Sequence, residues 1–261
     1  MSNHLIRVGA PGAVALAVAL CVGCSTPNPP STESAAKKAL AHHDIGVEYM
    51  SQGRIALAIR ELRAAKEASP EDPWIALALA EAYRRRGKAE EAEAEFLRAL
   101  ERDPELHRAR LNLAGMYIQL ERYAEAVPHL AQLVDDATFP APWRALTNLG
   151  WAQYRLGHRD EARRNLRIAI EYREDYWPAL LNLGILEQED GSTLEAMRLF
   201  ERVTEARAYP DAHAEANYRM AEIHVSLGQR RQALERLQAA ASTPAQGLWS
   251  RRSEEYLQLL R

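Results

Sequence analysis

The sequence predicts an all-α protein, a solenoid of six helical hairpins closed by one further helix at its C-terminal end. The first observation is a repeated tripeptide: Asn-Leu-Gly occurs at 148–150 and again at 182–184, a spacing of 34 residues. The second is that small residues recur at two fixed places in this period, and the third is that a glycine follows most of the expected first helices. A repeat of this length indicates stacked helical hairpins.

Counting in steps of about 34 places the starts of the six units at Ala39, Pro73, His107, Trp143, Trp177 and Ala214. The eighth position of each unit must be small, because the two helices of a hairpin cross closely there. It holds Gly46, Ala80, Ala114, Gly150, Gly184 and Ala221. The twentieth position, where the second helix meets the first, is always alanine: Ala58, Ala92, Ala126, Ala162, Ala196 and Ala233.

Large apolar residues occupy two further positions and predict the buried stripe of each helix. The seventh position holds Ile45, Leu79, Leu113, Leu149, Leu183 and Met220, and the twenty-fourth holds Leu62, Phe96, Leu130, Leu166, Phe200 and Leu237. One hairpin cannot bury its own stripe, so the units are predicted to stack.

Glycine and proline residues mark the ends of the predicted helices. The first helices are expected to end at Gly53, Gly87, Gly157, Gly191 and Gly228, since a left-handed residue after a helix costs glycine least. Pro70 and Pro104 end second helices, because proline cannot continue a helix interior. The period and these positions resemble tetratricopeptide repeats (TPR). We therefore expect six TPR units over residues 39–247 and a capping helix within 248–261.

The N-terminus resembles a bacterial lipoprotein signal. Arg7 precedes an apolar run at 14–20 that is too short to span a bilayer, and Val22-Gly23 then precede Cys24. The resemblance implies a signal peptide at 1–23, lipidation of Cys24 and a tether at 24–38. Ser25, directly after this cysteine, resembles a sorting signal for the outer membrane. Cys21 departs from the pattern, which usually has leucine at that place. An ordinary cleaved signal peptide is the alternative.

Composition and motifs argue against several classes of protein. A formal net charge of −3 gives no broad basic field, so nucleic acid is not an expected partner. The chain contains no Gly-x-Gly-x-x-Gly, Walker or His-Glu-x-x-His motif, and its eight histidines are scattered. Both cysteines lie in the first 24 residues, without the surroundings of a redox or zinc pair. We therefore predict no catalytic residues, no metal and no cofactor.

The inner face of the solenoid is the predicted binding surface. In a TPR superhelix, the second, fifth, sixth, ninth and twelfth residues of each first helix line the concave groove, because their spacing puts them on one face. The predicted partner-binding residues are Leu77, Leu111, Asn112, Ile118, Asn148, Trp151, Tyr154, Leu181, Asn182 and Ile185. They would form an apolar groove with amides placed to hold a peptide backbone or a helix.

Two alternatives apply to this surface. The apolar side chains could instead pack against the adjacent unit, and the asparagines could form local hydrogen bonds.

The run Arg84-Arg85-Arg86 is interpreted as a solvated helix end rather than an anion site.

Six TPR units behind a lipoprotein signal resemble the type IV pilus biogenesis lipoproteins, the secretin pilotins called PilF or PilW, with Tgl as the gliding-bacterial form. The most specific likeness is the insertion Asp136-Ala137-Thr138-Phe139-Pro140, followed by Asn148-Leu149-Gly150-Trp151, Tyr154 and Gly157. Ala245-Gln246-Gly247 before the last helix is most similar to the Tgl branch.

This resemblance implies a lipid-anchored protein on the periplasmic face of the outer membrane. Its partner would be the pilus secretin subunit, whose assembly or outer-membrane insertion it would promote. The alternative is an envelope scaffold that recruits peptidoglycan enzymes through its repeats. An enzyme is the third and least favoured hypothesis, because the fold itself serves many functions.

Overall fold

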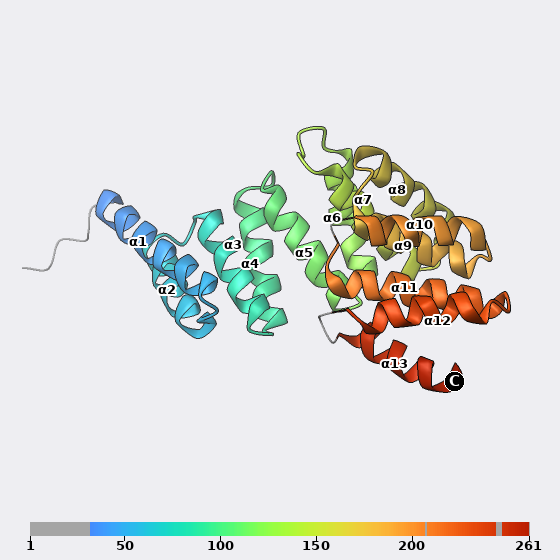
Figure 1. Cartoon of the computed structure of the whole chain (residues 1–261). Helices are drawn as coiled ribbons and strands as arrows, with labels where there is room; N and C mark the ends of the chain where they lie inside the picture. Colours follow the sequence, from blue (N-terminus) through green and yellow to red (C-terminus); the bar gives the residue numbers. More distant parts are fainter. Residues whose placement is uncertain (1–31, 207, 244–246, 261) are drawn as a thin grey trace, which may run out of the picture.

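The computed structural model describes residues 32–206, 208–243 and 247–260, and in these ranges it contains thirteen α-helices and no strand (Figure 1). Six antiparallel pairs follow one another, and a thirteenth helix ends the chain. The pairs are α1 (Thr32–Ser51) with α2 (Ile55–Ala68), α3 (Pro73–Arg85) with α4 (Ala89–Arg102), α5 (His107–Gln119) with α6 (Tyr123–Asp135), α7 (Pro142–Arg155) with α8 (Arg159–Tyr172), α9 (Trp177–Glu189) with α10 (Thr193–Glu205), and α11 (Pro210–Ser226) with α12 (Arg230–Ala241). The last is α13 (Leu248–Leu260).

The first helices of the hairpins form the inner layer of the solenoid. Each of α1, α3, α5, α7 and α9 contacts the next odd-numbered helix, and each second helix contacts its own first helix and the first helix that follows. Within the described ranges, successive second helices do not contact one another in this way. The solenoid is therefore closed on the side of the first helices and splayed on the other, which makes the first helices the concave wall.

The predicted repeat frame is confirmed at its most constrained positions. All six alanines at the twentieth position and all six large residues at the twenty-fourth are fully buried. At the eighth position, an added Cβ on Gly46, Gly150 or Gly184 would lie 2.6, 2.8 or 2.6 Å from the side chain at the twenty-fourth position of the same unit. The small residues are thus required because the two helices of each hairpin touch there.

The turn between the helices of each hairpin needs one left-handed residue. The five predicted glycines have φ between 69° and 87°. In the third unit the same place is held by Glu121, with φ of 58°, which is a strained conformation for a residue with a side chain. The backbone therefore keeps the same turn in all six units, even where the sequence lacks the glycine.

The N-terminal unit departs from the expectation in two ways. The helix α1 begins at Thr32, inside the segment 24–38 that was predicted as a tether, because Ala35 and Ala36 favour helix and Glu33 pairs with Lys37 one turn on. Ile45, expected in the core, is 45% exposed, since among the described residues no unit precedes α1 to cover it. Terminal units of a solenoid commonly differ from internal ones for this reason.

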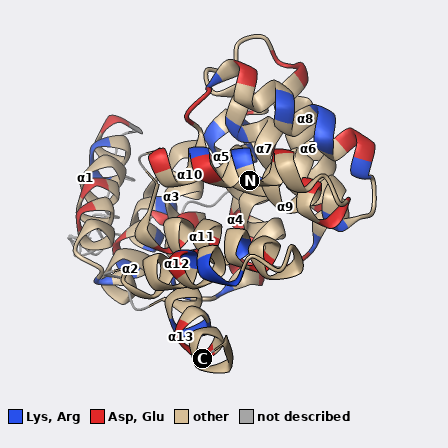
Figure 2. Cartoon of the chain, turned by 45° about the vertical axis from the view of Figure 1, so that its right-hand side comes forward, with Lys and Arg blue, Asp and Glu red and all other residues tan. Residues whose placement is uncertain are grey.

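The predicted signal peptide, Cys21, Cys24 and Ser25 lie outside the described residues. None of the helices in the described ranges has the length and apolar character needed to cross a bilayer. In the view of Figure 2, charged residues of both signs are interspersed along the helices.

Candidate functional site

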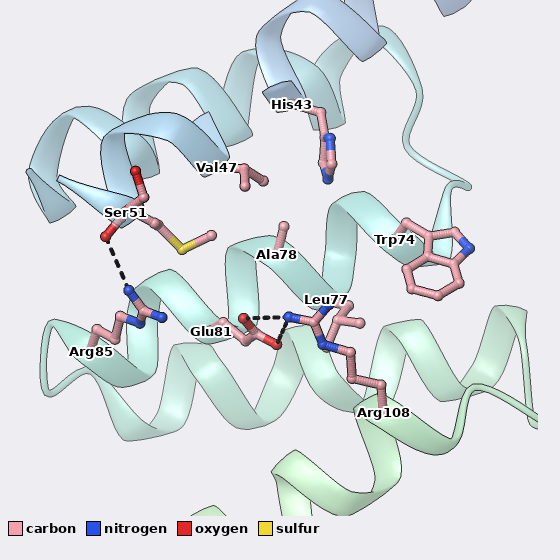
Figure 3. A pocket seen from close by; sticks show the side chains of 10 residues that line it. His43, Val47, Ser51, Trp74, Leu77, Ala78, Glu81, Arg85 and Arg108 are labelled. Atoms are coloured by element: carbon pink, nitrogen blue, oxygen red, sulfur yellow. Dashed lines mark hydrogen bonds and ion pairs between the residues drawn. The ribbon is translucent and has the colours of Figure 1, made fainter. Parts of the chain in front are cut away.

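The inner wall carries two adjoining cavities in the N-terminal half of the solenoid. One, of about 300 Å³, lies between α1 and α3 and reaches Arg108 on α5 (Figure 3). The other, of about 470 Å³, lies between α3, α5, α7 and the loop that joins α6 to α7. Glu81 and Arg108 line both cavities, so the two are parts of one groove. We call them the N-terminal cavity and the junction cavity, and together the inner groove.

Glu81 lies at the centre of the inner groove. The residue is only 7% exposed, and its carboxylate accepts a hydrogen bond of 2.7 Å from Asn112 Nδ2. Arg108 Nη2 lies 3.0 Å from the same oxygen, Oε1, and this pair is visible in Figure 3. A buried carboxylate requires such partners, because an unpaired charge in the interior is strongly unfavourable. The pair also joins α3 to α5 across the floor of the groove.

The loop between α6 and α7 forms one wall of the junction cavity and is held in place by Asp136. One carboxylate oxygen accepts hydrogen bonds from the Thr138 amide (2.8 Å) and hydroxyl (2.7 Å), and the other lies 2.6 Å from His107 Nε2. These bonds, those from Thr138 first, lower the pKa of Asp136 to about 2. Phe139 packs edge-on against the His107 ring at 5.4 Å, which fixes the loop as a wall of the cavity.

Four of the ten predicted partner-binding residues are buried in the core. Leu77, Leu111, Leu181 and Ile185 are each less than 7% exposed, which fits the alternative that such side chains pack against the adjacent unit. Their binding to a partner stays a prediction. All four belong to the hydrophobic core clusters of a solenoid in which successive first helices contact one another. Leu77 and Leu111 still reach the floor of the inner groove.

Trp151 and Tyr154 are half-buried and lie beyond the cavities, toward the C-terminal half. Their rings are 5.2 Å apart, and both pack against the core cluster of the last three units. The Tyr154 hydroxyl donates a hydrogen bond to Glu189. Burial, and then this bond, raise the pKa of Tyr154 to about 12. The pair therefore connects α7 to α9 and leaves only part of each ring open to a partner.

The remaining predicted residues are half-buried as well. Asn112 donates a hydrogen bond to Glu81 of the preceding unit, so its amide is already engaged within the protein. Asn148 and Asn182 lie at the equivalent positions of the next two units, and Ile118 packs on the core cluster of the first units. Their binding to a partner stays a prediction.

The C-terminal end of the inner wall is covered by the chain itself. The helix α13 contacts both α11 and α12. Trp249 and Tyr256 of α13 pack on Tyr218, with ring centroids 5.2 and 5.9 Å apart. Tyr218 occupies the fifth position of the last unit, so α13 closes the concave face there, as a capping helix is expected to do.

Charged residues of the groove were missed by the sequence prediction. Glu81, Arg84, Arg108 and Arg144 all occupy groove positions of the repeat frame, but only apolar and amide residues were selected. The same position list, applied to charges, would have found them.

The structure also brings together Glu105, His107 and Asp136, whose ligand atoms lie within 4.8 Å of one another. His107 and Asp136 are already bonded to each other and Glu105 is exposed. The closeness of His107 and Asp136 is explained by their bond, which holds the loop between α6 and α7 in place.

Comparison with known proteins gives the class of protein. Tetratricopeptide repeat families match residues 49–107, 84–149 and 147–213, which is more than half of the chain. The chain therefore belongs to the tetratricopeptide repeat family, as the hairpins and the repeat frame indicate.

Among curated proteins, the chain is similar to the type IV pilus assembly protein PilF of Pseudomonas aeruginosa. The two are 27% identical over 223 residues, which is 78% of this chain and 88% of PilF. The solved structure of P. aeruginosa PilF superposes with a TM-score of 0.70 at 18% identity, over 85% of this chain and 99% of that one. The structure of PilW, a type IV pilus biogenesis factor, gives 0.71 at 20% identity, over 82% and 97%. The chain is thus a TPR protein homologous to PilF, with the fold of PilF and PilW, and this part of the resemblance expected from the sequence is confirmed.

Proposed function

We propose that this protein is an outer-membrane lipoprotein of the type IV pilus machinery, which binds the pilus secretin subunit and promotes its assembly or outer-membrane insertion. The observation that carries the proposal is the similarity to PilF, which extends over 78% of the chain rather than over one repeat. The protein acts in this account by binding, through the concave wall of first helices, and not by catalysis.

The geometry of the solenoid suits this role. A superhelix offers a long concave wall on which a segment of another protein can lie, and here the N-terminal half of that wall is open while α13 covers the C-terminal end. Binding would shield apolar surface of a secretin subunit before it joins its ring. A lipid anchor on Cys24 would hold the bound subunits at the membrane and raise their effective concentration there.

Deletion of the gene tests this proposal. We expect heat-resistant secretin multimers to disappear from outer-membrane fractions while monomers persist, as followed by immunoblotting, and we expect surface pili to disappear with them. A plasmid copy of the wild-type gene should restore both, which controls for effects on neighbouring genes. Normal multimers in the deletion strain would refute the secretin role and favour a scaffold for peptidoglycan enzymes instead.

A further inference from the structure

The inner groove has an excess of positive charge in a protein whose formal net charge is −3. Four arginines line its two cavities, against one carboxylate: they are Arg84, Arg85, Arg108 and Arg144, with Glu81. The single carboxylate is buried and is already bonded to Arg108 and Asn112, so it does not neutralise the other arginines.

Two of these arginines have no ionic partner among the described residues. Arg84 reaches the side-chain oxygen of Gln119, at 3.5 Å. Arg144 interacts with the side chain of Tyr176, and in the described ranges no carboxylate lies within ion-pair distance of Arg84 or Arg144. Arg163 on α8 differs from these groove arginines, because it forms an ion pair of 3.0 Å with Glu187 on α9. Unpaired guanidinium groups in a concave site attract carboxylates, to which they can donate two parallel hydrogen bonds.

Apolar side chains lie beside these arginines. Trp74 is 53% exposed and Val47 is 40% exposed at the N-terminal cavity, so both present apolar surface to a ligand there. Figure 3 shows Trp74 at one end of this cavity and the Glu81–Arg108 pair along its floor. In the junction cavity, Phe139 and Pro140 form the wall across from Arg84 and Arg108. A ligand that fills the groove therefore needs both apolar and acidic groups.

We propose that the inner groove binds a peptide segment of the partner protein in which aspartate or glutamate stands next to large apolar residues. Arg84 and Arg144 bind the carboxylates, and Trp74, Val47 and the exposed Pro140 contact the apolar side chains. The inference rests on the proposed function for the identity of the pilus partner, but the chemistry of the segment follows from the groove alone.

An array of overlapping synthetic peptides tests this directly. The peptides cover the envelope-exposed parts of all type IV pilus proteins encoded in the same genome, and the probe is the full-length protein purified in detergent. We expect the retained peptides to combine acidic and large apolar residues. Retention of mainly neutral or basic peptides, or of none, would overturn the inference.

Charge variants supply the matched comparison. The double variant Arg84→Gln/Arg144→Gln removes two unpaired groove charges and leaves the Glu81–Arg108 pair intact. The control Arg198→Gln/Arg231→Gln removes two charges from second helices, where each arginine is at least 65% exposed and only loosely paired. By fluorescence anisotropy, we expect the groove variant to weaken binding of the best peptide roughly tenfold, since two charge-assisted hydrogen bonds are lost. We expect the control to stay within about twofold, because exposed and screened charges contribute little.

A charge-reversed form adds a readout that misfolding cannot imitate. Arg84→Glu/Arg144→Glu should lose the acidic peptides and retain basic ones on the same array. Equal binding of acidic peptides by wild type and by both groove variants would overturn the inference. This outcome is independent of the gene deletion experiment. If secretin multimers are lost in the deletion strain but the array shows no preference for acidic peptides, the proposed function stands and only the proposed peptide chemistry of the groove is refuted.

Discussion

Replacing Gly184 by alanine tests the close helix crossing on which the repeat frame depends. An alanine Cβ at this place would lie 2.6 Å from Cε1 of Phe200, a fully buried ring. Overpacking of this kind typically costs about 1 to 3 kcal/mol. Replacing a helical glycine by alanine returns about 0.5 to 1 kcal/mol through the smaller loss of backbone entropy. We therefore expect Gly184→Ala to lower the free energy of unfolding by up to about 2.5 kcal/mol.

Gly115 supplies the matched control. It lies in the middle of α5, one position further along its repeat than Gly184, and an added Cβ would meet nothing within 4 Å. Gly115→Ala should raise stability by about 0.5 to 1 kcal/mol, because only the entropy term remains. The difference between the two variants therefore isolates the clash. Thermal unfolding followed by circular dichroism can measure it, since about 1 kcal/mol moves the midpoint by roughly 2 to 4 °C in a domain of this size. A Gly184→Ala protein as stable as Gly115→Ala would refute the close crossing.

Three further predictions follow from other parts of the chain. Glu121→Gly should stabilise the protein by up to about 1 kcal/mol in urea unfolding, because glycine accepts the φ of 58° without strain; no gain would mean that the turn is not strained. Asp136 has a pKa lowered from 3.8 to about 2, so its contribution to stability is present above pH 3.8 and is lost as the pH falls through 2. Asp136→Asn should therefore have a lower urea midpoint than wild type at neutral pH, with the gap closing in acid, and a constant gap would contradict this. Cys24→Ala should abolish palmitate labelling, and labelling equal to wild type would rule out Cys24 as the anchor.

The repeat frame could be predicted from sequence because its positions are set by contacts within one hairpin. The small residue at the eighth position lies against the large side chain at the twenty-fourth position of the same unit, as the contacts of Gly46, Gly150 and Gly184 show. The same kinds of residue occupy these two positions in all six units. The helix–helix contact within each hairpin is therefore visible as a periodic pattern in the sequence. The same argument explains Glu121, since the frame marks its place as a turn even though no glycine is present.

The exposure of the groove residues could not be predicted in this way. Leu181 and Ile185 have the same repeat positions as residues that line open grooves in other superhelices, but here they belong to a buried core cluster. That burial depends on how tightly successive units are wound, which is a property of contacts between units. The buried Glu81, bonded to residues 27 and 31 positions further along the chain, is likewise set by the stacking of α3 on α5.

Site-specific photo-crosslinking in living cells tests the central claim most directly. A photoreactive amino acid is placed at Asn148, which is half-buried on the concave wall, and, as a control, at Arg164 on α8, whose side chain is 66% exposed on a second helix. We expect a crosslinked band that contains the secretin subunit from position 148 and none from position 164. Secretin crosslinks from both positions alike, or crosslinks from position 148 only to proteins other than the secretin, would contradict it.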